Sequence, residues 1–234
     1  IRLNELDGVV DKFVLVECTK THSLRDKPLY FEENKQRYEK FLHKIIHIVV
    51  EDMPERIEYQ HHIDNFHRAC IMRGLGEVKE EDLILISDLD EIPKRSLVDV
   101  TMETPTVFNH QNFGYSLNFK AMHPPEMRDW LGTIALRLHH LEENPIQVYR
   151  EARRDIAQNN NKLNGGWHFS YMGDAKVLRH KLESFSHTEI LQQNPTLTEE
   201  KIQQYIDAGA DFLQWFRYPP FGVRYQKFDL GELD

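Results

Sequence analysis

Hydrophobic residues in the first hundred positions form continuous runs that alternate with helical stripes. Continuous apolar runs, which predict strands, occupy residues 9–18 (VVDKFVLVEC), 45–50 (IIHIVV) and 82–87 (DLILIS). Residues 1–6, 32–44 and 55–75 place their apolar side chains at helical spacing. Strands that are apolar throughout are typical of a parallel sheet covered by helices on both faces. This half of the chain therefore predicts alternating strands and helices around a buried sheet.

Beyond Pro93 the pattern becomes less regular. Short strands are predicted at residues 106–109, 115–120, 133–138 and 167–172, and helices at residues 174–184 and 198–208. The 234 residues are 40% hydrophobic, enough for one substantial core, and no linker or repeat interrupts them. We predict a single α/β domain over residues 1–234, with a Rossmann-like, mostly parallel central sheet flanked by helices and a more irregular second half.

Composition narrows the classes of partner. A formal net charge of -9 repels nucleic acid, so any phosphate must be bound locally by a metal or by a few basic side chains. No run of about eighteen apolar residues is present, so no transmembrane segment is predicted within this chain. The two cysteines, Cys18 and Cys70, are expected to be small buried side chains and not a disulfide framework.

The candidate chemistry lies in the sequence Asp88-Leu89-Asp90. The chain contains 16 Asp residues, so chance alone supplies about one Asp-x-Asp match. Position makes this match informative, because the preceding apolar run would deliver it to the carboxyl end of a buried strand, where open α/β sheets bind ligands. If strand geometry continues, both carboxylates point the same way and converge on one Mg²⁺ or Mn²⁺. A solvated acidic turn or a helix cap is the structural alternative.

Several segments together resemble glycosyltransferase family 17, the family of the β-1,4-mannosyl-glycoprotein 4-β-N-acetylglucosaminyltransferases. The similar stretches are IRLNEL at residues 1–6, VVDKFVLVE at 9–17, KPLYFEENKQRY at 27–38, ILISDLDEIP at 84–93, GWHFSYMG at 165–173 and KLESFSHTE at 181–189. The resemblance implies a GT-A-type fold, a UDP-sugar donor such as UDP-N-acetylglucosamine, a divalent metal, and transfer with inversion to a glycan acceptor. Residues 1–100 would then bind the nucleotide sugar, and residues 101–234 would form the acceptor side. Residues 55–68 match the family pattern only loosely.

The resemblance assigns metal and donor ligands. Asp90 is expected to bind the metal directly, and Asp88 to contact the metal or the ribose. His168 is a candidate third metal ligand, although a histidine among apolar neighbours is more often a hydrogen-bonded core residue. The donor diphosphate has two candidate arginine ligands on the preceding helix, Arg68 and Arg73, either of which is otherwise simply solvated.

An inverting transfer also needs a general base for the acceptor hydroxyl, and a carboxylate is the usual choice. The candidates are Glu183, Asp129, Glu91 and Asp174, with Glu183 first because it falls in a family-like stretch. Glu91 is equally well explained as a salt bridge or cap. His187 is expected either to orient that carboxylate or contact phosphate, or to lie on the surface. Trp130, in the polar segment 128–130, is expected at the acceptor opening.

Two other functions compete with glycosyl transfer. Phosphohydrolases of the haloacid dehalogenase type also place Asp-x-Asp after an apolar strand, with the first Asp as nucleophile. A non-catalytic carbohydrate-binding module would account for the aromatic residues, although not for two carboxylates at a strand end. For location, the resemblance suggests the Golgi lumen with an anchor and first strand upstream of Ile1, whereas few cysteines and the absence of an Asn-x-Ser/Thr acceptor fit the cytoplasm.

Overall fold

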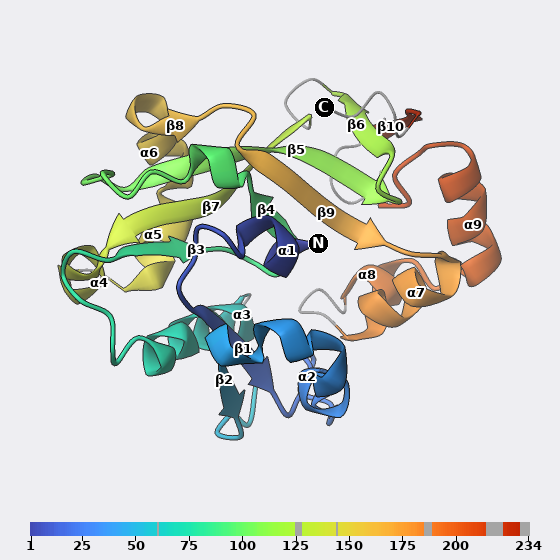
Figure 1. The fold of residues 1–234 in the computed structure, drawn as a ribbon. Coiled ribbons are helices and arrows are strands. Elements are labelled where there is room, and N and C mark those ends of the chain that lie inside the picture. Colours follow the sequence, from blue (N-terminus) through green and yellow to red (C-terminus); the bar gives the residue numbers. More distant parts are fainter. Residues whose placement is uncertain (60, 125–127, 144, 185–188, 214–221, 230–234) are drawn as a thin grey trace.

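The structure is a computed structural model that describes residues 1–59, 61–124, 128–143, 145–184, 189–213 and 222–229. Two sheets organise these residues, with the smaller sheet below the larger one in Figure 1. Within the described part of the chain, no helix is long and apolar enough to cross a membrane.

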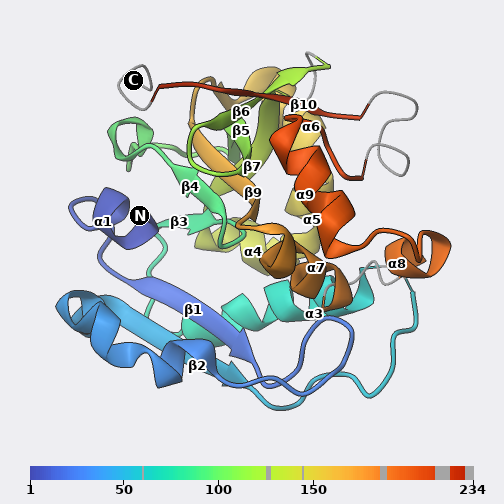
Figure 2. The same cartoon turned by 90° about the vertical axis from the view of Figure 1, so that its right-hand side faces the viewer.

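The small sheet contains two parallel strands, β1 (Phe13–Cys18) and β2 (Ile45–Val50), in register from Phe13 opposite Ile45 to Cys18 opposite Val50. Their connection runs through α2 (Tyr30–Glu33) and the 3-10 helix η1 (Lys35–Lys44). Next along the chain are α3 (His62–Ala69) and η2 (Cys70–Gly74), which pack against the sheet through a core that includes Cys18, Val50, Ile63 and Cys70. Figure 2 shows α3 lying between this sheet and the rest of the molecule.

The large sheet comprises, among the described residues, eight strands: β3 (Leu83–Ile86), β4 (Glu91–Pro93), β5 (Thr106–Tyr115), β6 (Phe119–His123), β7 (Asp129–Arg137), β8 (Asn161–Lys162), β9 (Gly166–Met172) and β10 (Arg224–Lys227). Strand β5 is the hub, because it pairs antiparallel with β6 and β7 and parallel with β8 and β9. β3 joins the sheet by antiparallel pairing with β7, and β4 by antiparallel pairing with β9.

Helices cover the large sheet in two groups. The first group follows β7 and comprises α4 (Leu138–Glu143), α5 (Ile146–Glu151) and α6 (Arg153–Asn159), which share a core with β3, β5 and β7. The second comprises α7 (Ala175–Ser184), α8 (Glu189–Gln193) and α9 (Glu199–Asp207), which pack around Tyr115, Tyr171 and Phe212. Two short elements lie near the Asp-x-Asp segment. α1 (Arg2–Leu6) contacts β4, and η3 (Arg95–Leu97) comes directly after β4 in the sequence.

Strand positions agree with the sequence predictions more closely than strand directions do. The three apolar runs form β1, β2 and β3, and the chain has the predicted mixed α/β character. The mostly parallel central sheet is not confirmed, because β3 pairs antiparallel with β7 and not with β1 or β2. An apolar run indicates burial on both faces but carries no information on the direction of the neighbouring strand.

Two predicted helices are shorter or tighter than expected. Most of residues 32–44 are wound as a 3-10 helix, and the predicted helix over residues 55–75 begins only at His62. Helices α4 to α6, in residues 138–159, have no counterpart in the sequence predictions. Both cysteines are buried and unpaired, as expected.

Candidate active site

The Asp88-Leu89-Asp90 segment forms a tight turn between β3 and β4 and does not continue the strand. Its closure depends on two hydrogen bonds: the Glu91 amide donates to the Asp88 carbonyl (3.1 Å), and the Asp88 amide donates to Glu91 Oε2 (2.9 Å). Leu89, at the tip, is 75% exposed. The strand geometry that would align the two carboxylates therefore does not continue beyond Ile86, and the two aspartates have different partners.

An arginine from the first helix, Arg2, donates hydrogen bonds to this turn. Arg2 Nη1 donates to the carbonyls of Asp88 (3.1 Å) and Glu91 (2.6 Å), and its Nη2 donates to Ser87 Oγ. Burial lowers the pKa of Arg2, against the opposing effect of the nearby carboxylates Glu91, Asp88 and Asp90. The position of the turn therefore depends on a residue more than eighty positions away in the sequence.

Asp88 and Glu91 are bound by arginines of α3 and α5. Arg68 contacts both oxygens of Asp88 (3.0 and 2.9 Å), and Arg150 donates to Asp88 Oδ2 (2.8 Å) and to both oxygens of Glu91 (2.9 and 3.0 Å). Burial alone would raise the pKa of Glu91, but the charge and hydrogen bonds of Arg150, with a hydrogen bond from Trp130, outweigh burial and hold that pKa well below its ordinary value. Fully buried and ionised, Glu91 is the structural anchor of the turn.

Asp90 faces a histidine instead of an arginine. His168 Nε2 lies 3.8 Å from Asp90 Oδ1, while its Nδ1 is 3.0 Å from the Asn112 side-chain oxygen. Because that oxygen is an acceptor, Nδ1 carries the proton, and Nε2 presents its lone pair toward Asp90. Burial lowers the pKa of His168 to about 3, so the ring is neutral near pH 7. Burial also raises the pKa of Asp90 to about 6, a shift opposed by Lys181 and reinforced by Glu91 and Asp88.

The pair Asp90 and His168 fits a divalent cation. With metal–ligand bonds of about 2.1 Å, two donors of one ion lie no more than about 4.2 Å apart, and 3.8 Å meets that limit. The carboxylate and the neutral imidazole are both in the form that binds metal. Among the described residues, no group of three or more His, Cys, Asp or Glu side chains surrounds a common point. Two protein ligands leave positions open for water and substrate oxygens, as in catalytic sites.

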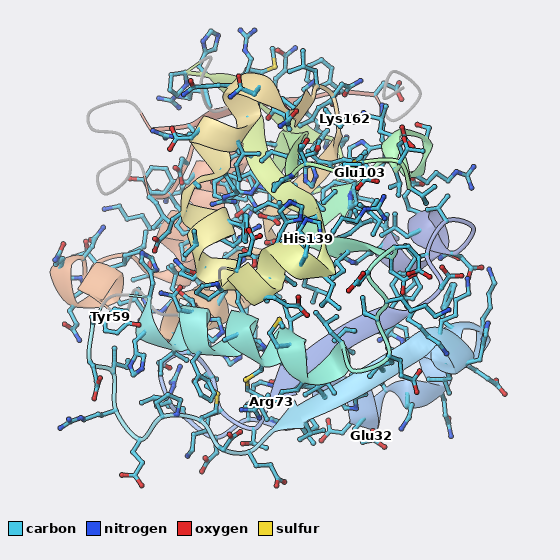
Figure 3. All side chains as sticks on the ribbon, turned by 90° about the vertical axis from the view of Figure 1, so that its left-hand side faces the viewer. Glu32, Tyr59, Arg73, Glu103, His139 and Lys162 are labelled. Atoms are coloured by element: carbon cyan, nitrogen blue, oxygen red, sulfur yellow. The ribbon has the colours of Figure 1, made fainter. Side chains whose placement is uncertain are left out.

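The structure brings only some of the other predicted residues to this turn. Arg68 contacts Asp88, whereas Arg73 makes a two-point ion pair with Asp52 (2.7 and 2.8 Å). Figure 3 places Arg73 beside the small sheet. Its predicted role as a diphosphate ligand is therefore not supported. His187 lies outside the described residues.

The base candidates differ in how far other contacts occupy their carboxylates. Glu91 has both carboxylate oxygens occupied by Arg150 and is therefore unsuited to accept a proton. Glu183 pairs with Arg179 across one turn of α7 (3.0 Å) and is partly exposed. Asp129 is exposed at the start of β7, and Asp174 Oδ1 accepts the Val177 amide at the start of α7 (2.9 Å).

The sequence did not predict the contacts of several residues of this site, including Trp130, which was expected at the acceptor opening. Trp130 belongs to β7 and not to a loop; its Nε1 donates to Glu91 Oε1 (2.8 Å) and its ring stacks on His168. Arg150 and Arg153 lie on helices that follow β7, so nothing local links them to residue 88. Lys181 was within a family-like stretch, but only the fold shows that its charge acts on Asp90.

Comparison with known proteins identifies the family of the chain. Residues 1–218 match the family model of glycosyltransferase family 17, and the chain belongs to this family of glycosyltransferases. It is 29% identical over 102 residues to the β-1,4-mannosyl-glycoprotein 4-β-N-acetylglucosaminyltransferases of Homo sapiens and of Rattus norvegicus. Each alignment covers 41% of this chain and 19% of the length of the relative. No solved structure shows a significant match.

Proposed function

We propose that the chain is a metal-dependent, inverting glycosyltransferase that moves a sugar from a UDP-sugar to a glycan acceptor. The observation that carries the proposal is the 3.8 Å approach of His168 Nε2 to the Asp90 carboxylate, at a turn otherwise bound by arginines. The names of the relatives favour N-acetylglucosamine as the sugar and a β-linked mannose of an N-glycan as the acceptor. A GT-A-type arrangement, in which the turn carries the metal, is part of the same proposal.

Asp90 and His168 would hold Mn²⁺ or Mg²⁺. The cation would neutralise the negative charge that develops on the diphosphate as the sugar departs. Asp90 suits this role because its carboxylate is partly buried and, among the described residues, no cationic side chain donates a hydrogen bond to it, in contrast to Asp88 and Glu91. A bound cation would supply the missing positive charge.

The other charged residues around the turn are suited to bind different parts of the donor. Arg68 and Arg150 already neutralise Asp88, so this carboxylate is better suited to accept a ribose hydroxyl than to bind the metal. Arg68 and Arg153, both partly exposed, can meet the diphosphate oxygens. Together with Arg2 and Arg150, they give this site the positive charge that a chain of net charge -9 lacks as a whole.

Glu183 remains our first candidate for the general base. Asp129 precedes Trp130 on β7, so by strand alternation its side chain lies on the face opposite to the Trp130 ring. α7 carries both Glu183 and Lys181, and the Lys181 charge reaches Asp90. The end of α7 also lies against the loop after β1, because Ser23 and Arg25 donate to the Glu183 carbonyl.

The phosphohydrolase alternative requires Asp88 to act as a free nucleophile. In the structure, both Asp88 oxygens accept hydrogen bonds from Arg68, and Oδ2 accepts another from Arg150. Such contacts lower the nucleophilicity of a carboxylate and restrict its approach to phosphorus. A non-catalytic carbohydrate-binding module is disfavoured by the match to a family of glycosyltransferases. Both alternatives are thus less consistent with the site than sugar transfer.

Turnover of a panel of UDP-sugars tests the proposal. With Mn²⁺ and a glycan that ends in β-linked mannose, mass spectrometry should detect UDP and one glycan extended by a single sugar. EDTA or Asp90→Ala should abolish the product, whereas Asp11→Ala, at an exposed position, should leave it unchanged. Product formation that persists in EDTA would refute metal dependence, and release of inorganic phosphate alone would favour the phosphohydrolase.

A further inference from the structure

Trp130 connects the structural anchor of the turn to the candidate metal ligand. Its Nε1 donates to Glu91 Oε1 (2.8 Å), and its ring lies parallel to the His168 ring, with centroids 4.4 Å apart and planes inclined by 16°. The Arg153 guanidinium lies 5.6 Å from the centre of the Trp130 ring. Trp130 is therefore held by a hydrogen bond at the edge of its ring and by contacts with the faces of the ring.

Glu91, which accepts the hydrogen bond from Trp130, is itself held in place. It is fully buried, and Arg150 and the Asp88 amide bind it in addition to Trp130. In the pairing of β4 with β9, Glu91 lies directly opposite His168. The residue that holds Trp130 therefore shares a backbone pairing with the residue on which Trp130 stacks.

His168 is consequently restrained on two sides. Trp130 fixes the plane of its ring, and Asn112 accepts from Nδ1 (3.0 Å) and so fixes its rotation and its tautomer. With these two contacts, Nε2 is the ring nitrogen directed at Asp90. A histidine free to rotate about its side-chain bonds would lose this direction for most of the time and would bind a cation less tightly.

We propose that Trp130 is a positioning residue for the metal site, which orients His168 from its anchorage on Glu91 and thereby sets the affinity of the chain for the divalent cation. This inference rests on the proposed function, because it takes His168 and Asp90 as the metal ligands. Trp130 itself contacts neither the metal nor the substrate in this role. Substitutions in such supporting positions typically weaken metal binding by about 10- to 100-fold.

Titration with Mn²⁺ alone, followed by the electron paramagnetic resonance signal of the free ion, measures this affinity without any turnover. Trp130→Phe removes the hydrogen bond to Glu91 and shrinks the stacked ring, and we expect affinity to fall about tenfold or more. Trp167→Phe is the matched control: Trp167 neighbours His168 on β9 but contacts Lys94 on the other face, so affinity should not change.

A second pair of variants tests the same restraint if Trp130→Phe does not fold. Asn112→Leu removes the acceptor for His168 Nδ1 and should lower Mn²⁺ affinity, whereas Asn112→Asp retains an acceptor and should restore it. Folding is checked by circular dichroism, since a purely structural role would lower the melting temperature without changing the affinity of the folded protein.

The two proposals fail in different ways. Unchanged Mn²⁺ affinity in folded Trp130→Phe, or equal affinities of Asn112→Leu and Asn112→Asp, would overturn the positioning role while leaving the metal site intact. Absence of Mn²⁺ binding by the unsubstituted chain, with and without UDP, would overturn the proposed function itself.

Discussion

At the scale of single residues, the acidic segment separates into three carboxylates with three environments. Glu91 is fully buried and neutralised by Arg150, Asp88 is partly exposed and neutralised by Arg68 and Arg150, and Asp90 faces a neutral imidazole. Three neighbouring acidic side chains can therefore take the separate roles of anchor, hydroxyl acceptor and metal ligand. Sequence identified the segment and favoured Asp90 as the metal ligand, but it left two roles open for Asp88 and for Glu91, because the arginines that bind them come from α3 and α5.

The charge on Asp90 should cost stability when no metal is bound. Its pKa is raised from 3.8 to about 6, so the folded state holds the proton more tightly than the unfolded state. The stability contribution of this group therefore falls as pH rises from about 4 to about 6 and stays unfavourable at pH 7. A shift of this size corresponds to roughly 3 kcal/mol, and partial exposure reduces the expected cost to about 1 kcal/mol.

Asp90→Asn should therefore raise the free energy of unfolding in EDTA at pH 7 by about 1 kcal/mol. The gain should disappear at pH 4, where the native carboxyl is protonated. Urea denaturation at the two pH values measures both quantities, with Asp11→Asn as the exposed control. If Asp90→Asn is no more stable than the unsubstituted chain at pH 7, the Asp90 carboxylate does not lower the stability of the folded state as inferred above.

At the scale of elements, the site depends on the antiparallel pair β4 and β9, which places Glu91 opposite His168. Gly166 permits this pairing: its φ is +147°, and a Cβ there would lie 2.0 Å from the Ile92 carbonyl oxygen. That approach is to backbone, so the strands would have to separate. A conformation open only to glycine thus underlies the closeness of β4 and β9.

Gly166→Ala should lower the free energy of unfolding by roughly 2 kcal/mol or more. It should also weaken Mn²⁺ binding, because β4 and β9 carry Glu91 and His168. Gly76→Ala is the control, since a Cβ at Gly76 would contact nothing within 4 Å. Chemical denaturation and Mn²⁺ titration of both variants provide the comparison. A Gly166→Ala protein as stable as the control would show that β4 and β9 are not so closely packed.

The sequence predicted where strands lie better than it predicted which strands pair with each other. The apolar runs located β1, β2 and β3, because burial of consecutive side chains leaves a direct pattern. The pairing of β3 with β7 joins residues about fifty positions apart, so no local pattern in the sequence encodes it. Residues 138–159 were missed as helices, and Arg150 and Arg153 were missed with them.

At the scale of the whole molecule, segments from both halves of the chain build the site. The first half supplies Arg2, Arg68 and the turn, and the second supplies Trp130, Arg150 and His168. Because β4 comes from one half and β9 from the other, the proposed metal site spans the predicted division into a nucleotide-sugar half and an acceptor half. Several arginines therefore lie together at this site, although the chain as a whole has a net charge of -9.

Asp90 and His168 are proposed to hold a cation that binds the donor diphosphate. Calorimetric titration with UDP, in Mn²⁺ and in EDTA, tests it most directly, with Asp90→Ala as the variant and Asp11→Ala as its control. Mn²⁺ should strengthen UDP binding to the unsubstituted chain and to Asp11→Ala, and Asp90→Ala should lose this gain. UDP binding that is equal in EDTA, or unchanged by Asp90→Ala, would show that Asp90 holds no cation for the diphosphate.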